Sequence, residues 1–220
     1  MGGLLKSSVA KKFAMALSGL FLVLFLAQHF TINLLSVINP DAFNSTSDFM
    51  GTNFFVQALL QPVLIFGVIF HFIMGFVLEI QNRNARVKNY VRYNGSANSS
   101  WMSRNMIYSG AVVLAFLGLH FYDFWVQELV HKYVESHPAD ATRYYGELVE
   151  KFVSPVRTGL YVISFVFLML HLLHGFSSSF QSMGIRNKYS EGIRKFTVGY
   201  AIIIPLGFIF IALFHYFNNL

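Results

Sequence analysis

The sequence predicts an all-α integral membrane protein, a bundle of five transmembrane helices. Of its 220 residues, 55% are hydrophobic, only 12% are charged, and 25 are phenylalanine. An ordinary soluble domain carries about twice that share of charged side chains. So few charges cannot cover so much apolar surface in water, and lipid is the better solvent for this chain.

Five continuously apolar segments are each long enough to cross a bilayer, which takes about 20 residues of helix. They lack the alternation of apolar and polar residues that a barrel strand shows, so we expect helices. The expected spans, in one domain covering residues 1–220, are 13–38, 54–80, 106–130, 156–180 and 196–217. The connection 39–53 has turn-like composition, whereas 132–154 is long enough for a short amphipathic helix.

The basic residues predict the orientation. Twelve of the 16 Lys and Arg residues precede the first span or lie in the second and fourth connections. The positive-inside rule therefore places the N-terminus in the cytoplasm and the C-terminus outside. The net charge of +6 follows this topology, and we expect no nucleic-acid partner. The same basic loops either serve only to orient the chain or also dock a partner.

Two further features limit the chemistry. The chain has no cysteine, which excludes disulfides, iron–sulfur ligation and thioether-linked haem within it. Any haem must therefore be held without a covalent link. We also expect no cleaved signal peptide, because the apolar run after Lys12 is too long for the core of one.

An internal repeat carries four histidines. The first and third spans contain SGLFLVLFLAQH and SGAVVLAFLGLH, which end at His29 and His120, so each histidine lies ten residues after a Ser-Gly step. The second and fourth contain HFIMGF from His71 and HLLHGF from His171, each with a glycine four residues after the histidine. Repeats in membrane proteins often place the functional site where they meet.

The depth of these histidines predicts two pairs. With a rise of 1.5 Å per residue and alternating helix directions, His29 and His120 fall at one level in the outer half. His71 and His171 fall together in the inner half. Two pairs at two depths suit two bis-histidine haems, because each iron takes an axial ligand from either face of the porphyrin. The alternative for a single histidine is a hydrogen bond to a neighbouring helix.

The sequence is less specific about the roles of the glycines and of the remaining histidines. The glycines at repeated offsets would let a flat macrocycle approach the backbone, although close helix packing is the alternative for each: Gly19, Gly75, Gly110 and Gly175. His174 lies three residues after His171 and is a secondary ligand candidate. We expect His131, His137 and His215 to be interfacial or solvated.

On these motifs the chain resembles the cytochrome b membrane-anchor subunit of succinate:menaquinone oxidoreductases and quinol:fumarate reductases, in the class with one anchor polypeptide and two haems. The resemblance covers all five spans. It is most specific at Gln28-His29, at the glycine-spaced His71 and His171, and at His120 with its aromatic helix end. Some relatives carry an acid two residues before the fourth-span ligand. Met169 stands there instead, so that proton route is not expected.

The resemblance implies a fuller picture. The four histidines would ligate two haem b groups stacked between the first four spans, the outer one by His29 and His120, the inner one by His71 and His171. The chain would be a subunit without a dicarboxylate site, in a bacterial cytoplasmic membrane. It would pass electrons between a cytoplasmic iron–sulfur subunit, itself bound to a flavoprotein, and menaquinone. A dimer of such heterotrimers is compatible with it, and either reaction direction fits.

Two sets of polar residues are site candidates, with interfacial anchoring as the alternative for each. Candidates for quinone binding or proton exchange surround the outer pair: Gln28, Asn33, Tyr122, Asp123, Trp125 and Glu128. Candidates for contact with haem propionates lie towards the cytoplasm: Lys11, Lys12, Ser18, Arg104, His174 and Ser178.

Two other functions remain open from the residues. The first is the di-haem anchor of another respiratory enzyme, of the nitrate reductase or hydrogenase type, which would share the haems but not the dicarboxylate partner. The second is a haem-free transporter of metal ions or protons that uses the histidines directly.

Overall fold

The computed structural model describes residues 7–84, 105–135, 140–185 and 187–219, and every regular element within them is helical. In this part of the chain, five helices are long and apolar enough to cross a membrane: Ser8–Ile38 (α1), Val56–Asn84, Met106–Val134, Pro155–Ser182 (α9) and Ser190–Phe217 (α10). The predicted all-helical fold with five helices of membrane-spanning length is confirmed. Three helices run several residues beyond the expected spans at the end of the bundle where α1 begins.

Two of the five spans contain π-helical turns. The second consists of the π-helical turn η1 (Val56–Leu60) and α3 (Gln61–Asn84). The third is α6 (Met106–His120), followed by η2 (Phe121–Val126), α7 (Gln127–Leu129) and η3 (Val130–Val134). A π-helical turn admits an extra residue into a helix and often marks a functional position. Here η2 begins directly after His120.

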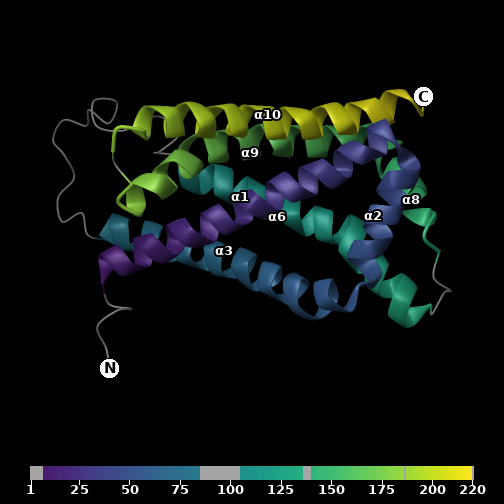
Figure 1. Cartoon of the computed structure of the whole chain (residues 1–220), viewed down its shortest axis with the longest axis horizontal. Helices are drawn as coiled ribbons and strands as arrows, with labels where there is room; N and C mark the ends of the chain where they lie inside the picture. Colours follow the sequence, from purple (N-terminus) through teal and green to yellow (C-terminus); the bar gives the residue numbers. More distant parts are fainter. Residues whose placement is uncertain (1–6, 85–104, 136–139, 186, 220) are drawn as a thin grey trace.

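The long helices lie side by side along the long axis of the molecule, with the two chain ends at opposite ends of the bundle (Figure 1). Helix α1 crosses the face of the bundle obliquely, α3 lies along one edge, and α9 and α10 lie together along the other. Two short helices, α2 (Pro40–Thr52) and α8 (Arg143–Phe152), cover the end where the C-terminus lies.

Helix α2 corrects the turn expected at 39–53. Asn39-Pro40 is a helix start here: the Asn39 side chain accepts a hydrogen bond from the Ala42 backbone N–H at 3.1 Å, and Pro40 takes the first helical position. Both residues are favoured at these positions. Asn44 then accepts a hydrogen bond from the backbone N–H of Tyr145 at 2.7 Å, which joins α2 to α8. The short helix expected within 132–154 is confirmed as α8.

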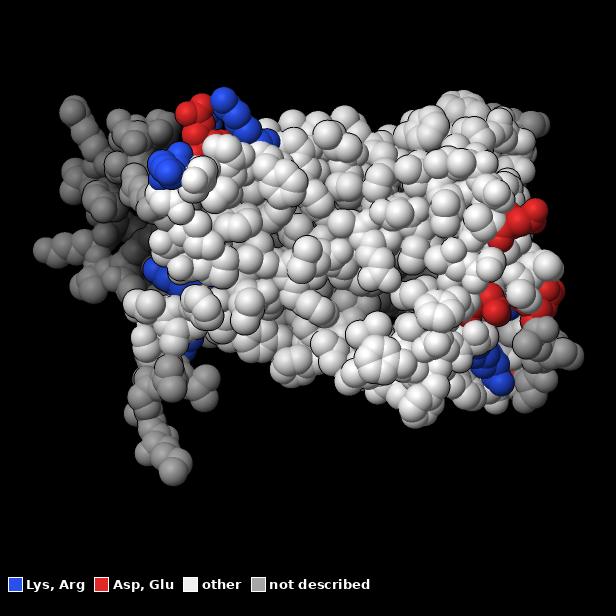
Figure 2. All heavy atoms as spheres, viewed as in Figure 1, with Lys and Arg blue, Asp and Glu red and all other residues white. Residues whose placement is uncertain are grey.

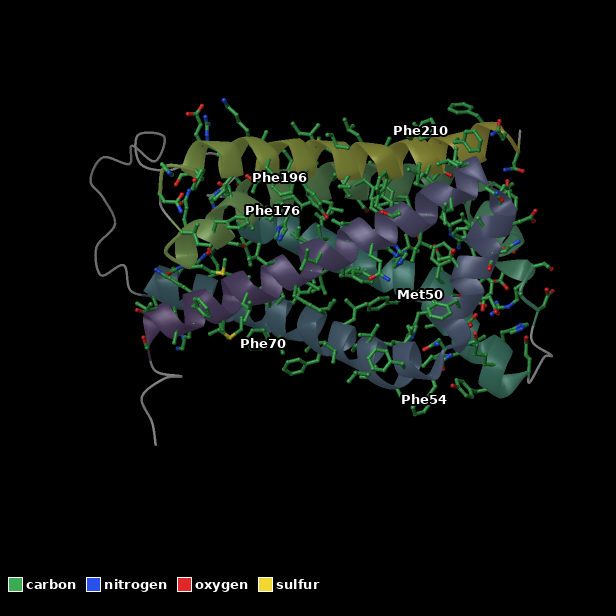
Figure 3. The ribbon with its side chains drawn as sticks, in the orientation of Figure 1. Met50, Phe54, Phe70, Phe176, Phe196 and Phe210 are labelled. Atoms are coloured by element: carbon green, nitrogen blue, oxygen red, sulfur yellow. The ribbon has the colours of Figure 1, made fainter. Side chains whose placement is uncertain are left out.

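Charged residues lie at the two ends of the bundle. On the face shown in Figure 2, Lys, Arg, Asp and Glu side chains gather at either end, and the broad band between them carries none. This distribution suits a bilayer core flanked by water. Large apolar side chains point outward along the same band, and Phe54 and Phe210 are 84% and 52% exposed (Figure 3).

The packed core lies on the side of α9 and α10. One cluster, near the capped end, includes Phe43, Phe152, Tyr161, Phe165 and Phe208. A second lies further along and contains Val23, Leu172, Phe176 and Ala201. Figure 3 shows Phe176 and Phe196 between α9 and α10, and their ring centroids are 6.0 Å apart. Packing against α10, the fifth long helix, therefore stabilises the bundle.

Gly207 gives a test of this packing. A Cβ atom there would lie 2.3 Å from Cε2 of Phe30 on α1, whereas one at Gly199 on the same helix would have no neighbour within 4 Å. We expect Gly207→Ala to lower the free energy of unfolding by about 1–3 kcal/mol, because a core that is already full must shift. Gly199→Ala, the matched control, should be neutral or stabilising by up to about 1 kcal/mol. Thermal or denaturant unfolding in detergent measures both, and equal effects would contradict the packing.

Candidate haem-binding site

A cavity of about 670 Å³ runs between α1, α3, α6 and α9. Its volume falls within the usual range for sites that enclose an organic ligand or cofactor. Its wall is mostly Leu, Val, Ile and Phe, and among the described wall residues Lys12 is the only one with a permanent charge. Helix α10 contributes only Phe208 and Ile211 to the wall. An enclosure of this kind suits a flat, largely apolar group.

All four histidines of the repeat line this cavity, and they face one another in two pairs. The ring centroids of His29 and His120 are 5.6 Å apart, with an angle of 87° between the rings. Those of His71 and His171 are 6.4 Å apart, at 72°. The structure thus brings together the same two pairs that the sequence predicts from helix depth.

The two rings of each pair lie close enough that both could offer a nitrogen to one metal atom. Two imidazoles are a donor set that would hold a haem iron. The pairs also stand at two levels. His71 contacts Ser18, which precedes His29 by eleven residues, or about 16 Å of helix.

The inner pair is held by the Ser-Gly steps of the repeat. Ser18 Oγ lies 3.1 Å from Nδ1 of His71, and Ser109 Oγ lies 3.4 Å from Nδ1 of His171. The glycine that follows each serine makes room for the same ring. A Cβ atom at Gly19 would lie 3.3 Å from Cε1 of His71. The repeat therefore positions imidazole rings.

The outer pair has a different, aromatic environment. Phe25 stacks on His29 with a centroid distance of 5.5 Å, and Phe124 lies 5.1 Å from His120. Nδ1 of His120 is buried and has no hydrogen-bond partner among the described residues. Asn33 donates to the His29 carbonyl at 2.8 Å, and its amide nitrogen is 3.4 Å from Nε2 of the same ring.

The glycines expected to admit a macrocycle have more specific neighbours. A Cβ atom at Gly110 would contact His171, as one at Gly19 would contact His71. Those at Gly75 and Gly175 would contact the terminal methyl groups of Met15 and Met106, at 3.6 and 2.9 Å. Gly19 and Gly175 line the cavity. Close packing thus explains part of the glycine pattern. The two methionines extend the repeat, because each lies four residues before the glycine of a Ser-Gly step.

The propionate candidates divide into three groups. Lys12, His174 and Ser178 line the cavity at the end where α1 begins. Lys11 instead donates to Gln81 at 3.3 Å, and Ser18 is engaged with His71. Arg104 lies outside the described residues, as does most of the basic connection that follows Arg83. Nε2 of His174 is 3.3 Å from Ser178 Oγ, one turn away on the same helix. The ring that faces His71 is that of His171.

Asp123 is buried next to the end of the cavity that lies near the cap, with 2% of its surface exposed. Tyr161, which lines the cavity, donates a hydrogen bond to its carboxylate at 2.9 Å. Arg157 Nε lies 3.5 Å from the same carboxylate oxygen, and a third of the Arg157 side chain is exposed. Sequence reasoning missed Tyr161 and Arg157, because only the packing of α9 against α6 brings them to Asp123.

Glu128 belongs to a second polar cluster, which joins the third span to the cap. Its carboxylate binds Arg143 of α8 and Lys132, and Tyr144 lies 3.4 Å away. Burial opposes the charge on Arg143, but the hydrogen bonds that Arg143 donates to Glu128 and Glu147 raise its pKa overall. Burial, together with the charge of Glu128, raises the pKa of the Tyr144 hydroxyl to about 12. Glu128 does not line the large cavity, so this cluster fastens the cap.

The other quinone candidates occupy different places. Asn33 and Trp125 line the outer part of the cavity, where Trp125 is 37% exposed. Tyr122 is 58% exposed and does not line the cavity. Gln28 is also exposed, and its amide lies 3.8 Å from Met50 Sδ. Asn33 and Trp125 are therefore the members of this set that can touch a molecule in the cavity.

His215 corrects an expectation. It is 1% exposed rather than interfacial, and its Nε2 lies 2.9 Å from Ser36 Oγ. Phe152 of α8 stacks against its ring with a centroid distance of 6.5 Å. The cap formed by α2 and α8 buries the end of α10, and the sequence did not predict that α2 is a helix. His137 lies outside the described residues.

No family model, curated protein or solved structure matches this chain. Among the described residues, no group of three or more His, Cys, Asp or Glu side chains converges on one point. The candidate ligands of this site are therefore two facing pairs.

Proposed function

We propose that this chain is the di-haem cytochrome b anchor subunit of a succinate dehydrogenase or fumarate reductase in a bacterial cytoplasmic membrane. The observation that carries the proposal is the two facing histidine pairs on the wall of one apolar cavity. When bound, two haem b groups supply reversible one-electron transfer between the two sides of the membrane. The enzyme partners follow from the resemblance described above.

The residues of the chain would hold, orient and insulate these groups. Each pair offers two imidazole nitrogens to one metal atom. The apolar wall excludes water, which keeps the local dielectric constant low and shields the iron from side reactions. Lys12, His174 and Ser178 offer polar contacts at the inner end, where acidic groups of a cofactor would otherwise be buried without partners.

The proposal predicts two low-spin b haems per chain and an assignment of ligands. His29→Ala and His120→Ala should abolish the same haem component, because their rings face each other, whereas His71→Ala and His171→Ala should abolish the other. Pyridine haemochrome analysis gives the stoichiometry, and redox titration of the spectrum identifies the component lost. His215→Ala, the matched control, removes a buried histidine that does not line the cavity and should leave both components in place. Loss of the same component from His29→Ala and His71→Ala would contradict the pairing.

A second prediction concerns the partners. A flavoprotein and an iron–sulfur subunit should co-purify with the chain, since it has no cysteine to hold a cluster. If they dock at the end where α1 begins, Arg83→Glu should reduce the recovered partner several-fold, because Arg83 is exposed there. Lys151→Glu, on α8 at the opposite end, should not. Recovery of a nitrate reductase or hydrogenase subunit instead would favour the alternative anchor.

Quinone would be handled at the outer end of the cavity. Asn33 and Trp125 line it there, and the Tyr161 hydroxyl on the wall is hydrogen-bonded to Asp123. Quinone reduction takes up protons, so a buried carboxylate behind a hydroxyl is a suitable donor and acceptor. The exposed part of Arg157 connects this pair to the outer water.

We therefore expect Asp123→Asn and Tyr161→Phe each to lower quinone turnover by about 10²-fold or more, the usual contribution of a positioned proton donor. Both haem spectra, and dicarboxylate oxidation with an artificial acceptor, should persist. Glu128→Gln, the control, changes an acid that does not line the cavity and should keep quinone activity in a folded protein. Full activity in both Asp123→Asn and Tyr161→Phe would refute an outer quinone site that uses this pair.

A further inference from the structure

The two serines of the repeat contact the inner histidines in the same way, and this contact bears on which ring nitrogen carries a proton. Ser18 Oγ donates to the Met15 carbonyl at 2.9 Å, and Ser109 Oγ donates to the Met106 carbonyl at 2.9 Å. A serine hydroxyl has one hydrogen, and its oxygen otherwise only accepts. While each hydroxyl hydrogen is engaged by the carbonyl of its own helix, the contact of each serine with Nδ1 of a histidine is a hydrogen bond only if the ring nitrogen is the donor.

We propose that Ser18 and Ser109 are positioning residues that hold His71 and His171 as the Nδ1–H tautomer. This inference rests on the proposed function, because it concerns the ligands of the inner haem. With the proton on Nδ1, the lone pair of a neutral imidazole is on Nε2, the nitrogen left for a metal. A hydrogen bond from the remote N–H also fixes the ring orientation and makes the ligating nitrogen more basic.

The glycine after each serine supports this role. A Cβ atom at Gly19 would lie 3.3 Å from Cε1 of His71 and 3.8 Å from its Nδ1, and at Gly110 the corresponding distances to His171 are 3.5 and 3.8 Å. The ring edge that carries Nδ1 is thus seated against bare backbone in both halves of the repeat. The Ser-Gly step forms one unit: the serine oxygen accepts a hydrogen bond from the ring N–H, and the glycine leaves room for the ring.

Two comparisons within the chain show that the arrangement is specific to the inner pair. Nδ1 of His120, in the outer pair, has no partner among the described residues. Ser36 makes the same bond to its own helix, donating to the Asn33 carbonyl at 2.6 Å, but it contacts Nε2 of His215 rather than Nδ1. His215 therefore has its Nε2 engaged by protein, and it does not line the cavity.

The test is a redox titration of the full chain in its complex, with Ser18→Ala and Ser109→Ala variants. Each should raise the midpoint potential of the same haem component by up to about 59 mV, a tenfold change in a one-electron equilibrium, because a less basic ligand stabilises the oxidised iron less. Haem affinity at that site should fall about 10–100-fold. The other component should not change.

Two further variants separate positioning from packing. Ser18→Thr keeps a hydroxyl that can bond to the preceding turn and should restore the potential. Ser164→Ala removes a buried hydroxyl that donates to the Leu160 carbonyl at 2.7 Å, and it should shift neither component.

Each outcome either supports or overturns the proposed role of the two serines. If two haems are present and the serine variants leave both potentials unchanged, or shift them no more than Ser164→Ala does, the inference is wrong and the proposed function stands. If the component they shift is the one that His29→Ala abolishes, the inference is wrong as well. If the purified chain carries no haem, the proposed function fails and the inference with it.

Discussion

A large apolar space kept open in the middle of the bundle is the constraint on which the rest of the structure depends. Protein interiors are normally filled to the density of organic crystals. Here the side chains stop short of one another around about 670 Å³, and the packed core is displaced towards α9 and α10. The fifth helix explains how this is possible. It contributes little to the cavity wall, but its contacts with α1 and α9 hold those two wall helices in place.

The repeat contains two kinds of helix that supply different residues to the histidine pairs. The surroundings of the inner pair differ from those of the outer pair. The first and third spans each supply a Ser-Gly step at the inner level and a histidine at the outer one. The second and fourth supply the inner histidines, so each inner site combines residues from both kinds of helix. At the outer level, aromatic rings replace the serines, and the nearest acid, Asp123, is bound by Tyr161 and Arg157. The two haems proposed here would therefore differ in ligand basicity and in access to protons.

Helix depth was predictable because it needs only the rise per residue and the direction of each span. This is why the pairs His29–His120 and His71–His171 followed from sequence. Features that depend on packing were not predictable. Asn39-Pro40 begins a helix as readily as a turn, and missing α2 made His215 appear solvated. Ser18 was expected at a propionate because its depth is right, whereas its bonds to Met15 and His71 depend on its rotamer.

The charged residues of the cavity wall limit the kind of ligand that the cavity can bind. A pathway for metal ions or protons through a membrane needs polar groups along its length, because an unpaired charge is costly there. In this cavity the permanent charge among the described wall residues is Lys12, at one end. The acids of the opposite end are taken up by partners outside the wall: Asp123 by Arg157, and Glu128 by Arg143 and Lys132. Between these ends lie the facing pairs of imidazole rings and hydrocarbon side chains. Such a wall suits a flat, largely apolar, metal-containing group at each pair better than an ion in transit, and its polar inner end suits the acidic edge of such a group.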